Sequence, residues 1–288
     1  MSDIELAVIG GSGLYDMPDL THVEEIEMTT PFGKPSDRLT LGTLHGRRLA
    51  FLPRHGRGHV LNPTEVPYRA NIFALKTLGV KYIIAVSACG SLREDYAPGH
   101  VVVPDQLYDN TRKRDSSFFE GGLVAHVSPA QPFSPELSTA LVQAVRASNG
   151  TVHTEGAFIT IEGPRFSTRA ESNTFRQWGM SIIGMTTSPE AFLAAEAEIA
   201  YACMAHITDY DVWHESEAPV TVEQVIRVLH HNTDLAQQAI RHLVAHMDEW
   251  AGEFAAHSAL QHALITDFNH VPDSVKSMLA PIINRYLS

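Results

Sequence analysis

Two acidic residues, Asp209 and Asp211, follow directly on the apolar run of residues 201–207. This run predicts a buried strand, and a carboxylate at the end of such a strand is costly unless it serves a ligand or a partner. A carboxyl group held there can take up a proton and donate it to a ring nitrogen of a base. The alternative is a pair of turn-forming or helix-capping Asp residues, because Asp is common in turns.

A second group of residues carries positive charge. Residues 53–59 read Pro-Arg-His-Gly-Arg-Gly-His, so two Arg and two His share a loop with two glycines. The planar guanidinium of Arg54 suits an oxyanion, and His55 adds a further donor. Because the chain has a formal net charge of −12, this cluster indicates an anion-binding site rather than an ordinary solvated surface.

Two runs of small residues follow predicted strands. Residues 10–13, Gly-Gly-Ser-Gly, let backbone amides and the Ser12 hydroxyl approach an anion. This run fits neither the dinucleotide nor the P-loop pattern, and a tight turn explains it equally well. Ser87 and Ala88 end the strongest predicted strand and permit close approach of a ligand. Cys89 beside them is explained better by packing than as a nucleophile, because buried cysteines are common.

Two further motifs stand at predicted helix starts. Phe166 is able to stack on a planar ring and Ser167 to hydrogen-bond to it, but a core Phe beside a helix cap is the alternative. Thr186 precedes a helix, and helix N-termini attract anions. Met185 is apolar and flexible enough to line a sugar pocket. For this second motif, a plain helix entry is the alternative.

The elements that position these motifs alternate between strands and helices, which predicts an α/β fold with continuous buried strands. In such sheets ligands bind at the carboxyl ends of the strands, and five polar motifs stand at predicted strand ends. Strands are predicted at residues 6–9, 38–44, 48–52, 82–86, 101–103, 156–161, 181–185 and 201–207, and helices at 64–78 and 135–147, from 168, from 187, from 221 to 247 and from 273.

The composition excludes several classes of protein. With 288 residues, 44% of them apolar and 19% charged, the chain has an ordinary globular composition. Its acidity argues against nucleic acid or a membrane surface as a partner. Two cysteines are too few for a disulfide framework, and no stretch reaches the roughly 18 apolar residues of a membrane span. We therefore expect a cytoplasmic protein, and the scattered His residues predict no metal site.

The chain changes in character near Trp250. Residues after it are rich in His and Ala and then contain Pro272 and Pro281. We expect residues 1–249 to form one domain and residues 250–288 to form a C-terminal helical arm.

Taken together and in this order, the motifs resemble the trimeric purine nucleoside phosphorylases, and within them the 5′-methylthioadenosine phosphorylases. The resemblance runs from Ile4 to about Met247 and includes residues 54–57, 88–93, 160–167, 185–190 and 208–213. It implies a single-domain three-layer sandwich, with a central mixed β-sheet flanked by helices. It also implies a homo-oligomer, a trimer or hexamer, that needs phosphate as co-substrate and no cofactor or metal.

The resemblance also assigns roles to residues. Asp209 and Asp211 match the catalytic and purine-binding carboxylates, and Phe166 and Ser167 complete the purine site. His126 matches a residue that a neighbouring subunit contributes. The remaining positions match the phosphate ligands (Ser12, Arg54, His55, Ser87, Ala88, Thr186), the ribose contact (Met185) and the apolar wall around the methylthio group (Val222, Val225, Ile226).

The implied reaction is phosphorolysis of S-methyl-5′-thioadenosine to adenine and 5-methylthioribose 1-phosphate, a step of methionine and purine salvage. A protonated Asp209 donates to purine N7, which requires a raised pKa. The alternatives are a phosphorylase of 6-oxopurine nucleosides or methylthioinosine, a hydrolytic nucleosidase, and a nucleoside sensor without activity. Asp209 speaks against the first, because Asn is expected there for a 6-oxopurine, and Arg54 with His55 speaks against the second.

Overall fold

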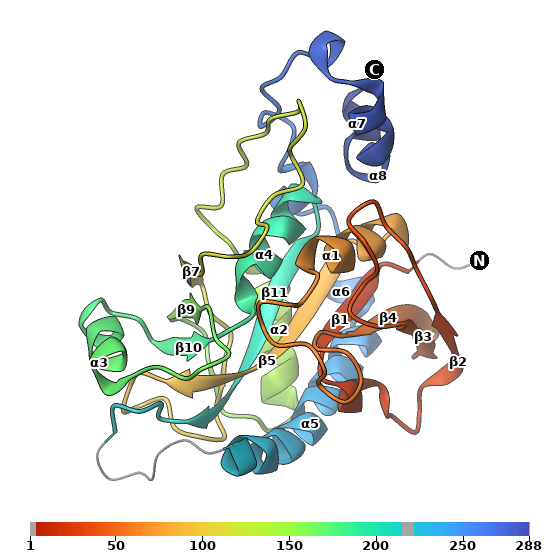
Figure 1. Cartoon of the computed structure of the whole chain (residues 1–288). Coiled ribbons are helices and arrows are strands. Elements are labelled where there is room, and N and C mark those ends of the chain that lie inside the picture. The colour runs from red at the N-terminus through yellow and green to blue at the C-terminus, as the bar shows by residue number, and fades with distance from the viewer. Residues whose placement is uncertain (1–3, 215–221, 288) are drawn as a thin grey trace.

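Two ten-residue strands, β5 (Tyr82–Ser91) and β11 (Ala200–Asp209), form the centre of the molecule in this computed structural model (Figure 1). The structure describes residues 4–214 and 222–287, and of Ser12 and residues 222–231 the backbone alone. The two strands run parallel, from Ala200 beside Tyr82 to Asp209 beside Gly90. Their long apolar sequences follow from burial on both faces of the sheet.

Nine further strands extend an eleven-stranded sheet in the order β2-β3-β4-β1-β5-β10-β9-β7, with β11 beside β5 and β6, and β8 beside β6. β1 runs parallel to β4 and β5, whereas β10 runs antiparallel to β5, so the sheet is mixed as expected. The bounds are β1 Leu6–Gly10, β2 Thr21–Ile26, β3 Leu39–Leu44, β4 Arg47–Pro53, β6 Val101–Val102, β7 Gln106–Asn110, β8 Val152–His153, β9 Ala157–Ile161 and β10 Ile182–Gly184.

Helices cover both faces of the sheet, which gives three layers (Figure 1). Alternate residues of β11 serve the two interfaces: Tyr201 and Cys203 pack with α1, α4, α7 and α8, and Ala202 and Met204 pack with α2, α5 and α6. The helices are α1 Tyr68–Thr77, α2 Pro135–Ala147, α3 Arg169–Gln177, α4 Thr187–Glu196, α5 Val222–Ala245, α6 Met247–Trp250, α7 Asp273–Met278 and α8 Ala280–Ile283.

Several predicted elements are confirmed. The strands predicted at 38–44 and 48–52 are β3 and β4, which pair antiparallel as a hairpin, and the helix predicted at 135–147 is α2. The helix predicted from 168 is α3. It begins with a capping box, in which the Thr168 hydroxyl accepts from the N–H of Glu171 at 3.2 Å and the Glu171 carboxylate accepts from the N–H of Thr168 at 2.7 Å. The start of the helix predicted from 221 lies outside the described residues.

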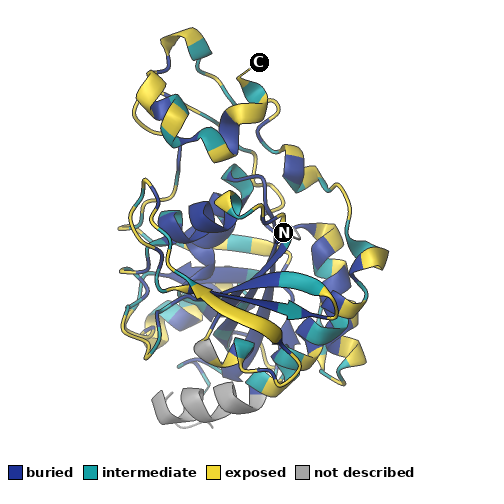
Figure 2. Ribbon diagram, turned by 90° about the vertical axis from the view of Figure 1, so that its right-hand side faces the viewer, coloured by how far each residue is buried: buried dark blue, intermediate teal, exposed yellow. Residues whose placement is uncertain are grey.

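Other boundaries were wrong. The helix predicted from Thr64 begins only at Tyr68, because Asn62 Oδ1 accepts from the N–H of Thr64 at 2.9 Å and holds a turn there. The motif at Ser87 does not follow its strand, since β5 continues to Ser91 through pairing with β11 and β10. The sequence analysis also missed β2, whose residues are exposed and polar and lie at the sheet's edge (Figure 2).

Residues 251–287 form short helices and turns that stand with the loop of residues 111–134 at the top of Figure 1. The two segments are paired: a bridge joins Ala125 to Leu264, and the N–H of His126 donates to the carbonyl oxygen of Ala263 at 2.8 Å. The division into a domain and an arm stays a prediction. Apolar residues of the segment, Leu260, Val271, Val275, Leu279 and Ile283 among them, belong to the same core cluster as β1, β5 and α4.

Candidate active site

Asp209 is the last residue of β11, and Asp211 follows in a left-handed conformation with φ 51°. Both residues are 8% exposed. The N–H of Asp211 donates to Asp209 Oδ1 at 2.8 Å, which fixes the two carboxyl groups relative to each other. Burial raises the pKa of Asp209 above its ordinary value, and burial with the charge of Asp209 raises the pKa of Asp211 to about 6. Both carboxyl groups can therefore hold a proton nearer to neutral pH than an exposed Asp.

A threonine adjoins this pair. The Thr208 hydroxyl lies 2.5 Å from Asp209 Oδ2 and 3.2 Å from the carbonyl oxygen of Cys89. A hydroxyl has one proton to donate and can accept as well. The Thr208 hydroxyl donates to Asp209 Oδ2, which favours the carboxylate and opposes the effect of burial on the pKa of Asp209.

The last residues of β5 leave room for the acidic pair. A Cβ atom at Gly90 would lie 3.0 Å from Asp209 Oδ1 and 3.2 Å from the Cβ of Asp211. Beyond the pair, Trp213 donates from Nε1 to the carbonyl oxygen of Ser91 at 2.7 Å. Residues 209–213 are thereby tied to β5 at both ends. Cys89 is buried in the core, as its packing interpretation predicted.

Arg54, at the end of β4, is 3% exposed and forms a bidentate pair with the fully buried Glu190 of α4, with contacts of 2.7 and 2.8 Å. Tyr201 donates to the same carboxylate at 2.8 Å. Arg54 also donates to the carbonyl oxygens of Val86 at 3.0 Å and Ile9 at 3.4 Å. Within the described part of the chain, these contacts engage four of its five N–H groups.

The neighbouring His55 is neutral near pH 7, because burial and the charge of Arg54 lower its pKa to about 4. Its Nδ1 lies 2.9 Å from the carbonyl oxygen of Leu61. A carbonyl oxygen only accepts, so we assign the ring proton to Nδ1. Nε2 is then an acceptor, which differs from the donor role expected from the sequence.

Strand direction brings the remaining motifs to the middle of β5. Because β10 runs antiparallel to β5, with Ile183 beside Gly90, its carboxyl end approaches Ala88, and a Cβ at Gly184 would lie 3.5 Å from the carbonyl oxygen of Ala88. Thr186 then stands at the N-cap position of α4, and its side chain makes no capping hydrogen bond there. Met185 lies against Gly163, whose φ of 65° and missing side chain both suit this contact.

Many buried polar atoms without a hydrogen-bond partner belong to these motifs. They are the hydroxyls of Ser87, Thr187, Ser188, Ser167 and Ser172, and Asp211 Oδ2. Ser87 and Thr187 adjoin the thiol of Cys203, which is a weak partner, and Ser172 adjoins the Asp211 carboxyl group. Buried polar groups are normally paired more fully than this, so these groups are available to a polar ligand. Phe166, which is expected to stack on a planar ring, is 43% exposed and therefore accessible to a ligand.

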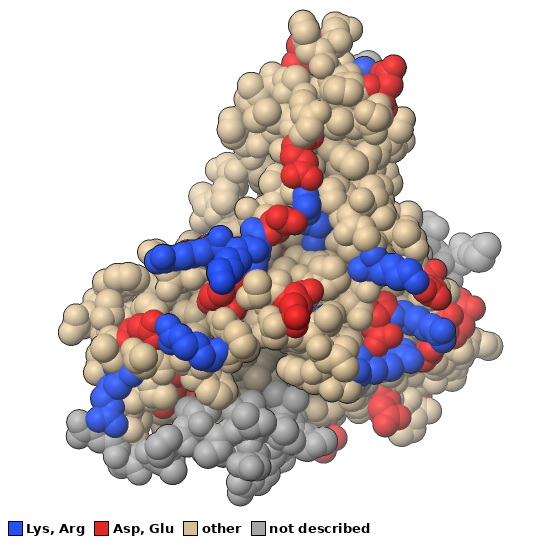
Figure 3. Space-filling view, in the orientation of Figure 1, with Lys and Arg blue, Asp and Glu red and all other residues tan. Residues whose placement is uncertain are grey.

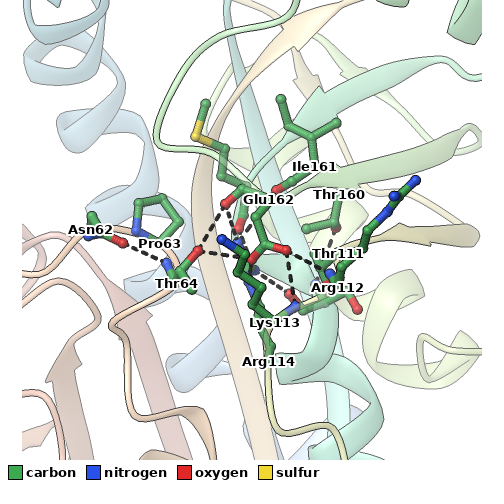
Figure 4. A network of polar contacts seen from close by, with 12 residues as sticks. Asn62, Pro63, Thr64, Thr111, Arg112, Lys113, Arg114, Thr160, Ile161 and Glu162 are labelled. Carbon is green, nitrogen blue, oxygen red and sulfur yellow. Dashed lines mark hydrogen bonds and ion pairs between the residues drawn. The ribbon is translucent and has the colours of Figure 1, made fainter.

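The sequence analysis missed Glu190, Thr208 and a buried network around Arg114 and Glu162 (Figure 4). Arg114 donates to the carbonyl oxygens of Met185, Ser188 and Glu162. A single Arg in a loop gave no local signal, because these partners lie 48 to 74 residues away in the chain.

Some of the predicted site residues lie away from Asp209, and the side chains of others lie outside the described residues. The loop that carries His126 lies at the top of Figure 1, whereas β11 ends towards the bottom, so the chain does not bring His126 to its own Asp209. The side chains of Ser12, Val222, Val225 and Ile226 lie outside the described residues, and their roles stay predictions.

Charges on the face shown in Figure 3 are mixed, with Lys and Arg side chains beside Asp and Glu. Among the described residues, no group of three His, Cys, Asp or Glu side chains is arranged to hold a metal ion. In the same part of the chain, no helix is both long and apolar enough to cross a membrane.

Comparisons find relatives along the whole chain. Residues 5–245 match the family described as the phosphorylase superfamily. The S-methyl-5′-thioadenosine phosphorylase of Chloroflexus aurantiacus is 57% identical, with 100% of each chain covered. A methylthioadenosine phosphorylase from an antarctic soil metagenomic library has a TM-score of 0.94 and 48% identity, covering 98% of this chain and 99% of that one. The methylthioadenosine phosphorylase from Schistosoma mansoni in complex with adenine has a TM-score of 0.82 and 34% identity over 98% of both chains.

Proposed function

Because this chain belongs to the phosphorylase superfamily, and within it to the S-methyl-5′-thioadenosine phosphorylases, we propose that it cleaves S-methyl-5′-thioadenosine with phosphate. The products are adenine and 5-methylthioribose 1-phosphate. The observation that carries this function is the placement of two polar groups along β5, with Arg54 bound to the carbonyl oxygen of Val86 and the buried, protonatable carboxyl pair of Asp209 and Asp211 beside Gly90. One end suits an oxyanion and the other a purine.

At the anion end, we assign phosphate to Arg54, His55, Ser87, Ala88 and Thr186, with Ser12 from the glycine loop. The free N–H of Arg54 and the hydroxyls of Ser87 and Thr186 donate to phosphate oxygens. Nε2 of a neutral His55 accepts a hydrogen bond from the O–H group of hydrogen phosphate. Phosphate then attacks C1′ of the sugar, and its negative charge stabilises the positive charge that builds on the ribose.

At the purine end, Asp209 in its protonated form donates to N7 and makes adenine a better leaving group. Burial of Asp209 supports this role, because burial favours the neutral carboxyl group. Asp211 and Ser167 hydrogen-bond to the base and Phe166 stacks on it. The 6-amino group of adenine donates to a carboxylate, which a 6-oxopurine cannot do.

Between these ends, Met185 contacts the ribose, and the apolar wall of Val222, Val225 and Ile226 surrounds the methylthio group. An apolar wall disfavours the 5′-hydroxyl of adenosine, because a hydroxyl left without a hydrogen-bond partner costs roughly 1–3 kcal/mol. His126 reaches the site of a neighbouring subunit, so the active form is a homo-oligomer, a trimer or a hexamer. The reaction needs no cofactor besides the phosphate co-substrate and serves methionine and purine salvage in the cytoplasm.

The test is the rate of adenine release from S-methyl-5′-thioadenosine with and without phosphate, beside inosine as a control substrate. We expect release that depends on phosphate and little cleavage of inosine. Faster cleavage of inosine would favour a 6-oxopurine nucleoside phosphorylase. Release without phosphate would mean a hydrolase, and no release from any nucleoside would leave a binding protein.

A further inference from the structure

Arg114 is a buried cation whose side chain is only 1% exposed. Its guanidinium donates from Nη1 to the carbonyl oxygens of Met185 and Ser188, both at 2.6 Å, and from Nη2 to that of Glu162 at 2.7 Å. Nε lies 3.3 Å from the Glu162 carboxylate, and Nη1 is 3.1 Å from the Tyr68 hydroxyl. The guanidinium thus serves backbone groups of the protein rather than a ligand.

One nitrogen of Arg114 joins the residue after β10, Met185, to the first turn of α4, at Ser188, whose backbone is not helical. The two carbonyl oxygens that it bridges, of Met185 and Ser188, enclose Thr186, the proposed phosphate ligand. In a planar trans peptide the C=O and the N–H point in opposite directions. Because the carbonyl of Met185 faces Arg114, the N–H of Thr186 points away from it. The curvature of this turn and the direction of its first amide are therefore set by Arg114.

The other nitrogens of Arg114 hold the start of the purine-binding segment, residues 162–167. Glu162 is fixed in turn: its carboxylate accepts from the Thr64 hydroxyl at 2.9 Å and from the N–H groups of Arg112 at 2.6 Å and Lys113 at 3.1 Å (Figure 4). Met185, whose carbonyl oxygen is one attachment point, lies against Gly163, which follows the other attachment point at Glu162. Arg114 therefore spans the anion-binding turn and the purine-binding segment.

We propose that Arg114 is a positioning residue that sets the spacing between the phosphate-binding turn and the purine-binding segment, with Glu162 holding its guanidinium. The proposal rests on the function proposed above. A buried ion pair is weak evidence for stability, because well-packed apolar residues often replace one without loss. The planar fork of Arg114 reaches its partners from three separate nitrogens, whereas the ammonium of Lys offers its three donors from one nitrogen.

The chain offers a matched control in Arg69. Arg69 anchors the same loop through Asp115 and Glu120, each at 2.6 Å, and its side chain is 18% exposed. Among the described contacts it reaches no residue of the site. Arg69, in α1, and Arg114, in the loop, both hold this loop through a guanidinium, but only Arg114 also contacts the site. The same change, Arg to Lys, therefore separates support of the loop from support of the site.

The experiment compares Arg114→Lys, Arg69→Lys and the unaltered protein for kcat and for KM of phosphate and of S-methyl-5′-thioadenosine. We expect Arg114→Lys to lower kcat/KM about 100-fold, since small displacements of reacting groups cost this much, and to raise both KM values. We expect Arg69→Lys to stay within about twofold of the unaltered protein, the range of ordinary surface changes. Equal losses in the two variants, or unaltered kinetics in Arg114→Lys, would overturn the proposal.

A failure of the proposed function is distinguishable, because it would show as absence of phosphate-dependent adenine release in the unaltered protein itself. If Arg114→Lys does not fold, Tyr68→Phe removes one contact of Arg114, together with the hydrogen bond from Tyr68 to the carbonyl oxygen of Pro63 at 2.8 Å, and leaves every charge in place. We expect kcat/KM to fall a few fold, which corresponds to about the free energy that one hydrogen bond contributes. An unchanged kcat/KM with Tyr68→Phe would then contradict the positioning role.

Discussion

Asp209 is the residue whose chemistry decides the choice of base. In Asp209→Asn, an amide can donate to O6 of a 6-oxopurine but can no longer act as an acid towards N7. We expect the ratio of kcat/KM for S-methyl-5′-thioadenosine to that for inosine to fall on the order of 100-fold, which general acid catalysis typically contributes. An unchanged ratio, measured side by side on both nucleosides, would contradict the assignment.

Thr208 offers a test of the protonation state of Asp209. Burial raises the pKa of Asp209, and the hydrogen bond from Thr208 lowers it by favouring the carboxylate. Phosphorolysis needs the protonated acid, so the rate falls as pH rises through this pKa. Thr208→Val removes the bond and raises the pKa further, so we expect the alkaline limb of kcat to move up by about one pH unit.

The pH profile of Asp209→Asn is the reference for this experiment, because that variant lacks the titrating acid. We expect its alkaline limb to be absent. A limb that stays in Asp209→Asn belongs to another group, for which Asp211 with its pKa of about 6 is the nearest candidate. A shift to lower pH in Thr208→Val would also contradict the proton-donor role.

The residues that sequence could predict are those whose own types carry chemistry at a strand end. Asp209 follows a run of apolar residues, and Arg54 stands out in an acidic chain. Glu190 is 136 residues from Arg54, and Arg114 is 71 residues from Met185. Only the folded sheet makes these neighbours, so the groups that hold the site residues in place could not be inferred from local pattern.

At the scale of elements, one buried carboxylate attaches residues 255–287 to the sheet. Glu198, between α4 and β11, is 3% exposed and accepts from the N–H of Leu260 at 3.0 Å. It also accepts from Arg285 at 3.4 Å and from the Tyr286 hydroxyl. Since the segment pairs with the loop of His126 in turn, Glu198 supports that loop indirectly.

We expect Glu198→Gln to loosen this segment, because an amide cannot accept on both of its polar atoms. Loss of a charge-assisted bond and an unmatched buried partner should cost about 1–3 kcal/mol. Amide hydrogen exchange should quicken in residues 255–287 and in 123–127. Glu253→Gln, at a side chain that is 84% exposed, is the control, and equal protection in both variants would show that Glu198 does not hold the segment.

Element boundaries were predicted best where turns and caps are local. The capping box of α3 depends on Thr168 and Glu171 alone, so sequence was sufficient. β2 and the extension of β5 to Ser91 depend on pairing with distant strands, which local pattern does not contain. The mixed direction of the sheet came from the family resemblance, not from periodicity.

At the scale of the whole molecule, the place of His126 away from the carboxyl end of β11 leads to a prediction about assembly. If a neighbour supplies His126, chains with His126→Ala and chains with Asp209→Asn should complement each other when co-expressed. In random mixed closed rings about one quarter of the sites would have both residues intact. We expect that fraction of the unaltered rate of adenine release.

The two variants expressed separately are the controls for complementation, and both should be impaired. Size-exclusion chromatography with light scattering should find the mixed protein in the same oligomeric state as the unaltered protein. No gain in activity on mixing would mean that His126 does not serve a neighbouring site.

The ion pair between Arg54 and Glu190 also bears on how tightly the enzyme should hold its reactants before the reaction. Because Glu190 cancels the charge of Arg54 and His55 is neutral, these residues offer phosphate directed donors but little net positive charge. These residues therefore do not neutralise the negative charge of phosphate, and that charge can stabilise the sugar cation that forms during cleavage. Phosphate is then bound less tightly in the ground state than in the transition state, and this difference in binding free energy increases the rate.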